Sequence, residues 1–252
     1  MPIWSILLIV SVSLFAGAGV FALERLVPAS RREPQNEVVG FVYAVVGVAY
    51  AVLLGLVVIA AWNTLDEATA NTYAESNALM QLAWYGHSLP QPQQAEVEHL
   101  VEAYTTLVIN TEWPELAHQE SSPQAWSVYI QLRNLVQAQQ PTTPSAVARY
   151  QQALDAGSQL GDTRRERIEQ AAEGIPALLW GALVIGGIVT VGFAYFFGMK
   201  SKVSHSLVMF SLSLIFSCLL LVVFELNYPF GGIVKVSPEA FKLALAQMQL
   251  VF

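Results

Sequence analysis

Apolar positions along this chain fall into four long runs, arranged as two pairs on either side of a polar stretch. The runs are Ile3–Leu23, Val38–Trp62, Ile175–Met199 and Ser204–Leu226. Each is near or above the roughly 20 residues that a helix needs to cross the hydrocarbon core of a bilayer. The pattern predicts an all-α polytopic membrane protein with four transmembrane helices and a helical-bundle insert between spans 2 and 3.

The same pattern predicts four segments. Residues 1–62 hold spans 1 and 2, residues 63–175 the insert, residues 176–227 spans 3 and 4, and residues 228–252 an amphipathic C-terminal segment. The first run lacks the basic start of a signal peptide, so we expect it to be retained as a span. We expect the last segment to lie on the membrane surface or against the insert.

Prolines and helical spacing divide the insert. The second span has no Gly or Pro between Gly55 and Gly86, which predicts one helix that continues to about His87. Further helices are expected over residues 93–111, 122–139 and from about 145 onward, with Ser122 as a helix cap and a break or kink at Trp113-Pro114. The first and last insert helices are expected to continue spans 2 and 3 as rods.

The amino-acid composition narrows the classes of molecule that this protein is expected to bind. The chain is 54% hydrophobic and 12% charged, against about 25% charged residues in a soluble domain. The insert holds fourteen acidic residues, five arginines and no lysine. This acidity argues against nucleic acid as a partner. The expected partners are the lipid bilayer, inorganic ions and further copies of the chain. The lone Cys218 lies in the fourth run, where packing is its expected role.

Basic residues in the short loops predict the orientation. The first loop contains Arg25, Arg31 and Arg32, and the third contains Lys200 and Lys202. Cytoplasmic loops are enriched in such residues, so the insert and both termini are predicted outside a plasma (cell inner) membrane. Three arginines just before the third run, at positions 164, 165 and 167, argue for the opposite orientation.

Enzyme signatures are missing from the sequence. It has no Gly-x-Ser-x-Gly, His-Glu-x-x-His, phosphate-loop or Cys-x-x-Cys pattern. The histidines of the insert, His87, His99 and His118, are scattered and are interpreted as surface residues. We therefore expect neither an enzyme, nor a cofactor, nor a metal site.

The spans carry charges only near their ends, which argues against a proton relay at the membrane centre. Small residues recur along the second run at helical spacing, which favours close packing. The residues proposed near a constriction, if this helix packs around an oligomer axis, are Tyr43, Gly47 and Tyr50. The candidate charges at pore mouths are Arg31, Arg32, Glu37 and Glu225, for which simple anchoring at the interface is the alternative.

Two stretches resemble a known family. The run from Arg31 to Leu54 resembles the second span of the bacterial bestrophin-like membrane proteins. The end of the chain shares that family's acidic-Leu-Asp-Arg-Pro-Phe-x-Gly and Val-Ser-Pro segments at Glu225, Leu226, Pro229, Phe230, Gly232, Val236, Ser237 and Pro238. Asn227 and Tyr228 replace the usual Asp-Arg, which puts in doubt any role of that charge pair.

The resemblance implies a function that the residues alone do not give. True bestrophins are pentameric anion channels with an Asn-Pro-Phe-Gly segment, to which Asn227-x-Pro229-Phe230-Gly231 is similar. A homo-oligomeric ion channel is therefore the first hypothesis. Anion selectivity follows from the analogy, whereas the acidic insert would concentrate cations. The alternative is a non-conducting sensor or scaffold whose insert binds a partner.

Overall fold

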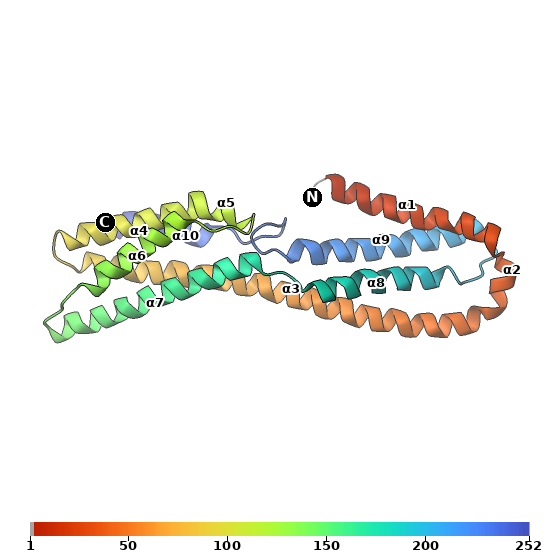
Figure 1. Ribbon diagram of the computed structural model, residues 1–252, viewed down its shortest axis with the longest axis horizontal. Coiled ribbons are helices and arrows are strands. Elements are labelled where there is room, and N and C mark those ends of the chain that lie inside the picture. Colours follow the sequence, from red (N-terminus) through yellow and green to blue (C-terminus); the bar gives the residue numbers. More distant parts are fainter. Residues whose placement is uncertain (1–2, 252) are drawn as a thin grey trace. The chain divides into compact units, whose positions relative to one another are not determined.

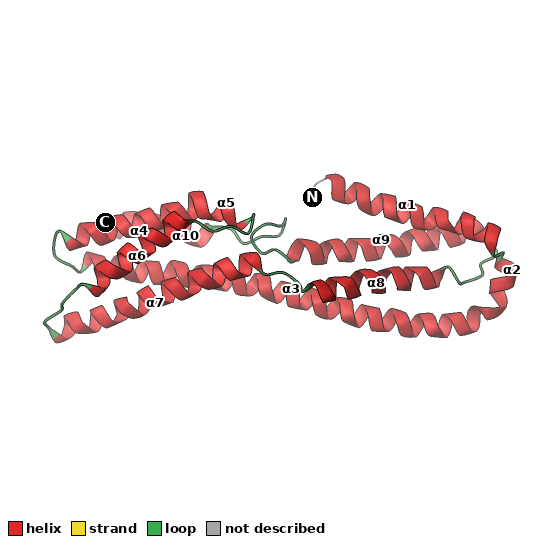
Figure 2. Cartoon of the chain, viewed as in Figure 1, coloured by secondary structure: helices red, strands yellow, loops and turns green. Residues whose placement is uncertain are grey.

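The computed structural model describes residues 3–251 (Figure 1). Figure 2 shows helices joined by loops, and no strand occurs within the described residues. The elements are α1 (Ile3–Leu26), α2 (Ala29–Arg32), η1 (Glu33–Gln35), α3 (Asn36–His87), α4 (Gln93–Leu107), the π-turn η2 (Val108–Glu112), α5 (Trp113–Leu116), α6 (Pro123–Gln137), α7 (Pro144–Ala172), α8 (Ala177–Ala194), α9 (Lys202–Leu226) and α10 (Glu239–Val251).

The chain forms two compact units. The membrane unit comprises residues 3–62 and 175–227, and the insert unit comprises residues 63–174 and 228–251. Four helical stretches are long and apolar enough to cross a membrane. The all-α, four-span fold class is thus confirmed, and the chain is a multi-pass membrane protein.

The longest helix confirms one expectation. α3 is a single helix of 52 residues that ends at His87. Without glycine or proline over 30 consecutive positions from Leu56 to Tyr85, nothing interrupts its backbone hydrogen bonding. The second span and the first insert helix are therefore one element.

The prediction that the last insert helix continues into span 3 as one rod is wrong. α7 ends at Ala172, and the non-helical residues 173–176 separate it from α8. Gly174 is a poor helix former, and Pro176 lacks an N–H and disfavours a helical residue before it. The insert thus shares a continuous helix with span 2 but not with span 3.

The structure refines two smaller boundaries. Of the break or kink expected at Trp113-Pro114, the break does not occur, because η2 leads into α5 and Pro114 lies in its first turn, where a missing N–H costs no hydrogen bond. α7 begins at Pro144 with Thr143 as its cap. Ser122 caps α6 as expected, accepting a hydrogen bond from the Ala125 N–H at 3.5 Å.

The C-terminal segment packs within the insert unit. The Ser76 hydroxyl donates to the Ala240 carbonyl at 2.8 Å, and the ring of Phe241 lies 5.8 Å from that of Trp113. Phe241 and Met248 of α10 are buried. The amphipathic helix thus adds its apolar side to the core of the insert.

Candidate functional site

The three constriction candidates lie on the span part of α3. Tyr50 is buried, its hydroxyl donates to the Leu183 carbonyl at 3.1 Å, and its ring meets Phe216 edge-on at 5.2 Å. Tyr43 is half-buried and meets Phe197 edge-on at 5.6 Å. Both tyrosines therefore have partners inside the chain, and their part in a constriction stays a prediction.

Glycines on α8 make room for Tyr50. A Cβ at Gly186 would lie 2.7 Å from Tyr50 Cδ2, and one at Gly187 would lie 3.0 Å from the Tyr50 hydroxyl. Both approaches are closer than ordinary van der Waals contact, so larger residues there would displace the ring. Gly186 and Gly187 thus serve a contact within one chain, whereas a Cβ at Gly181 or Gly192 would meet no atom within 4 Å.

Gly47 has a different environment from the two tyrosines. It is half-exposed, and a Cβ at this position would meet no atom within 4 Å. The exposed side of α3 near it carries further small residues, Ala44, Ala51 and Gly55. This part of α3 has no partner within the described chain, so it is available to lipid or to another copy.

Arg32 is at the centre of a polar cluster. Its guanidinium pairs with the Glu24 carboxylate, and Nη1 donates to the carbonyls of Tyr195 at 2.7 Å and Phe197 at 2.8 Å. Nε donates to the Val27 carbonyl at 3.1 Å. The two Nη1 bonds satisfy carbonyls just after α8, which ends at Ala194 and not at the Met199 expected from the sequence.

The other mouth candidates are placed differently from Arg32. Arg31 and Glu37 are exposed, whereas Arg32 is buried at 5% exposure. Glu225 is partly exposed near the end of α9. Arg31, Glu37 and Glu225 remain candidates to meet ions, and the bonds of Arg32 favour a role in joining the loops of the membrane unit.

Asn36 makes a second link in the same cluster. Its side-chain amide donates to the Gly198 carbonyl at 2.9 Å and accepts from the Gly198 N–H at 2.8 Å. A Cβ at Gly198 would lie 2.7 Å from the Ala29 carbonyl oxygen. Only glycine allows this approach of the two loops.

The motif residues after span 4 form a turn. Pro229 accepts from the Val236 N–H at 2.8 Å, and the buried Phe230 ring meets Trp113 edge-on at 5.5 Å. Gly232 is half-buried, and Ser237 and Pro238 precede α10. In this structure the family motif positions the C-terminal helix, while a direct part in conduction stays a prediction.

Asn227, one of the residues that depart from the motif, has a structural role. Its side-chain oxygen accepts from the Ile175 N–H at 2.5 Å. Ile175 comes just before α8 begins, so this bond satisfies a backbone donor at the start of a span. The usual aspartate offers the same acceptor, and the substitution keeps this bond possible.

The sequence reasoning missed a buried network of charges in the insert. Arg167 donates to both oxygens of Glu75, at 2.6 and 3.0 Å, and to Glu112 at 2.7 Å. Arg164 pairs with the other oxygen of Glu112 and donates to the Ser122 carbonyl at 3.1 Å. These charged side chains are at most 3% exposed. Two arginines and two carboxylates thus neutralise each other inside the insert.

Aromatic groups complete this network. The Arg167 guanidinium lies 5.3 Å from the ring of Trp113 and 5.7 Å from that of Phe241, which favours its positive charge. Burial opposes that charge, but the carboxylates of Glu75 and Glu112 outweigh burial and raise the pKa of Arg167 above its ordinary value. Arg167 is therefore a permanent cation in the core.

Tyr104 joins the network through its hydroxyl, which donates to Glu75 at 2.6 Å. Burial, and then the negative charge of Glu75, raise the pKa of Tyr104 well above its ordinary value of 10.0. The tyrosine stays neutral and keeps its proton in this hydrogen bond at physiological pH.

Helical spacing contained a signal for this network. Arg164 and Arg167 fall on the same face of α7 as the buried Leu160 and Ala171, and Glu75 shares a face of α3 with Leu79. Charges on an apolar face indicate buried pairs. From the sequence alone, the arginines at 164, 165 and 167 are interpreted only as charges that flank a span. Across residues 3–251, no three His, Cys, Asp or Glu side chains are grouped to hold a metal.

Comparison with known families decides the identity at the level of the family. A family model described as the bestrophin-like domain matches residues 10–241. The chain belongs to the bestrophin-like family. The resemblance seen in the second span and in the C-terminal motif is thereby confirmed.

Solved structures share the fold of this bestrophin-like protein. A crystal structure of a point mutant of a bacterial bestrophin homologue from Klebsiella pneumoniae is similar with a TM-score of 0.68 and 16% identity, over 98% of both chains. A second mutant of that homologue gives 0.67 and 14%, over 99% of this chain and 98% of that one. A structure described as a membrane protein mutant gives 0.67 and 14%, over 99% and 97%. No curated protein matches the chain.

Proposed function

We propose that this protein is a homo-oligomeric ion channel of the cell membrane. The observation that carries the proposal is the bestrophin-like match across residues 10–241, which supports an ion channel at the level of the family. The four apolar helices supply a membrane-spanning body. Its partners are then lipid, inorganic ions and further copies of itself.

The exposed side of α3 supports assembly. Small residues let helix backbones approach closely in a membrane, and Ala44, Gly47, Ala51 and Gly55 have room on this side. Because a Cβ at Gly47 would meet no atom within 4 Å, the side chain of Gly47→Leu starts in open space within the chain. A loss of assembly in this variant would therefore report a contact between copies.

Ion selectivity has to come from pore width, polar groups and charges at the ends of the spans. The helices of the membrane unit carry their Asp, Glu, Lys and Arg residues near their ends, as Glu24, Glu37 and Glu225 illustrate. We propose anion selectivity by analogy with bestrophins. The acidic insert supports the opposite sign, which the measurement below decides.

Flux measurements on reconstituted protein test the channel. Wild type in liposomes with unequal chloride and sodium gradients should conduct, and its reversal potential gives the sign of the ion. Gly47→Leu should lose both oligomer mass and flux, whereas the matched control Val48→Leu, at an exposed apolar position, should keep both. A wild type without flux at any pH, calcium level or membrane tension would support the scaffold alternative instead.

We propose that the insert faces outward, on the basis of the loop charges. Since Cys218 is the only cysteine, a Cys218→Ala background with Ser121→Cys places one thiol in an exposed loop of the insert. An impermeant maleimide should label it in intact cells. Labelling only after lysis would place the insert in the cytoplasm. Because Arg32 pairs with Glu24, one positive charge of the first loop is neutralised, and the loop charges support an outward-facing insert less strongly.

A further inference from the structure

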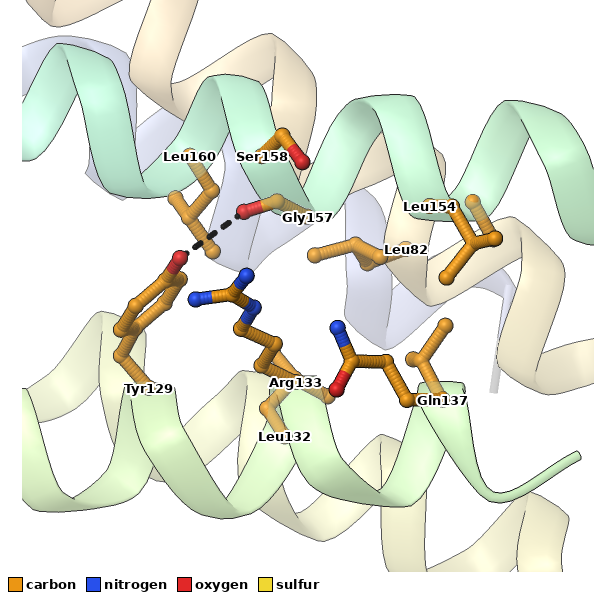
Figure 3. Close-up of a pocket in the computed structure, with 11 residues that line it drawn as sticks. Leu82, Tyr129, Leu132, Arg133, Gln137, Leu154, Gly157, Ser158 and Leu160 are labelled. Atoms are coloured by element: carbon orange, nitrogen blue, oxygen red, sulfur yellow. Dashed lines mark hydrogen bonds between the residues drawn. The ribbon is translucent and has the colours of Figure 1, made fainter.

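The insert contains a pocket of about 250 Å³ between α6, α7 and α3 (Figure 3). Leu82, Leu132, Val136, Ala153, Leu154 and Leu160 give it an apolar lining. A dry apolar cavity of about 150 Å³ is enough to bind benzene. This pocket can therefore hold an apolar group the size of an aromatic ring, with space left for a polar substituent.

Gly157 leaves part of this pocket unfilled because it carries no side chain. A Cβ at Gly157 would meet no atom within 4 Å, although the residue is buried. Gly161, one turn later on α7, is different because a Cβ there would overlap the Tyr129 side chain. Packing thus explains Gly161, and it does not explain Gly157, which costs about 1 kcal/mol of helix stability relative to alanine.

Polar groups lie on one side of this apolar space. Figure 3 shows Arg133 and Gln137 extending from α6 toward α7, where Ser158 lies. The Tyr129 hydroxyl is already used, since it donates to the Gly157 carbonyl at 3.2 Å. Arg133 and Gln137 therefore offer N–H donors to a ligand, and only Arg133 carries a charge.

Arg133 differs from most arginines of the insert. Arg164, Arg165 and Arg167 each pair with a carboxylate. No salt bridge joins Arg133 or Arg149 to a carboxylate within the described residues. In an insert with fourteen acidic residues, Arg133 keeps an unneutralised guanidinium at the edge of an apolar pocket.

We propose that this pocket binds a small organic monocarboxylate with a ring-sized apolar body. The guanidinium of Arg133 would take the carboxylate, in the planar geometry that suits this pair. The apolar body would fill the space over Gly157. An inorganic anion would leave that space empty, and a neutral apolar molecule would leave Arg133 without a partner.

Fluorine NMR of 4-fluorophenylacetate, added to the full-length protein in detergent, tests the proposal. Saturable line broadening above that of empty micelles is expected, with a dissociation constant of about 1 mM or tighter. 4-Fluorophenylacetamide, its neutral counterpart, should bind at least about tenfold more weakly, because it lacks the charge that Arg133 recognises.

Three variants assign the site. Gly157→Leu should abolish binding by filling the pocket, and unchanged circular dichroism would show that α7 is intact. Arg133→Gln should weaken binding about tenfold or more. The matched control Arg149→Gln removes the other unpaired arginine, which does not line this pocket, and should bind as wild type does. The proposal would be overturned if the wild type showed no saturable binding, or if the neutral amide bound equally well. It would also be overturned if Gly157→Leu or Arg133→Gln bound the carboxylate as the wild type does.

Discussion

The two units of this protein treat polar side chains in opposite ways. The insert unit buries four charged residues at its centre, where Arg167 connects Glu75 and Glu112. The membrane unit holds its charges at helix ends. Buried hydroxyls inside its spans bond to carbonyls, either of their own helix, as Ser13 does to Ile9 at 2.8 Å, or of a neighbour, as Tyr50 does to Leu183 at 3.1 Å.

The outer surfaces of the two units also differ in polarity. Large apolar side chains are exposed on the membrane unit, for example Phe15 at 81% and Leu178 at 83%. The exposed ion pair of Asp162 and Arg165 is typical of the insert. The two units thus follow different physical rules. In water, charged side chains are stable on the surface and need a partner when they are buried, whereas in lipid they are stable only near the interface.

The largest effect is expected from breaking the insert network. Arg167→Met leaves two buried carboxylates without their shared partner, which costs about 3–5 kcal/mol. Hydrogen exchange of α4 and α7 peptides should accelerate strongly in the full-length protein. Arg165→Met, which removes an exposed cation two residues away, should change stability by less than about 1 kcal/mol. Equal effects of the two variants would contradict a special role for burial.

A smaller effect is expected from the membrane unit. Arg32→Gln removes the pair with Glu24 and a charged donor to the carbonyls of Tyr195 and Phe197. Hydrogen bonds to charged groups contribute about 1.5–3 kcal/mol, so the thermal stability of the solubilised protein should fall. The neighbouring Arg31→Gln, at an exposed position, serves as control. A matching fall in the control would show that loop charge, not the cluster, is responsible.

Two glycines of α7 should respond to alanine with opposite signs. Gly161→Ala brings a methyl group into the Tyr129 side chain and should cost about 1–3 kcal/mol through overpacking. Gly157→Ala meets no atom and should stabilise the helix by about 0.5–1 kcal/mol. Hydrogen exchange of α7 measures both. Destabilisation by Gly157→Ala would mean that its surroundings are tighter than the pocket suggests.

The smallest effect concerns alkaline pH. The folded state raises the pKa of Tyr104 above its ordinary value of 10.0, so the unfolded chain loses this proton first. Its contribution to stability is complete below pH of about 10 and is lost as pH rises further. Tyr104→Phe should lose about 1 kcal/mol at neutral pH and should show less additional loss at high pH. Melting curves between neutral and alkaline pH would reveal an identical slope if Tyr104 had no part.

The sequence predicted most of the elements correctly. The four spans, the uninterrupted α3 and the cap at Ser122 depend on apolar run length, on the lack of Gly and Pro, and on local side-chain chemistry. These are properties of neighbouring residues, so one sequence contains them. The break before α8 differs from the expected rod, although its causes, Gly174 and Pro176, are local and visible in the sequence.

The tertiary structure decided which distant residues meet. Glu75, Glu112 and Arg167 come from three separate elements, and no local rule pairs residues 92 positions apart, as Glu75 and Arg167 are. The burial of Arg32, the partners of Tyr50 and the pocket over Gly157 were hidden for the same reason. Periodicity tells which face of a helix is buried, but the packing of helices determines what that face meets, because contacts between helices depend on the shapes of both surfaces.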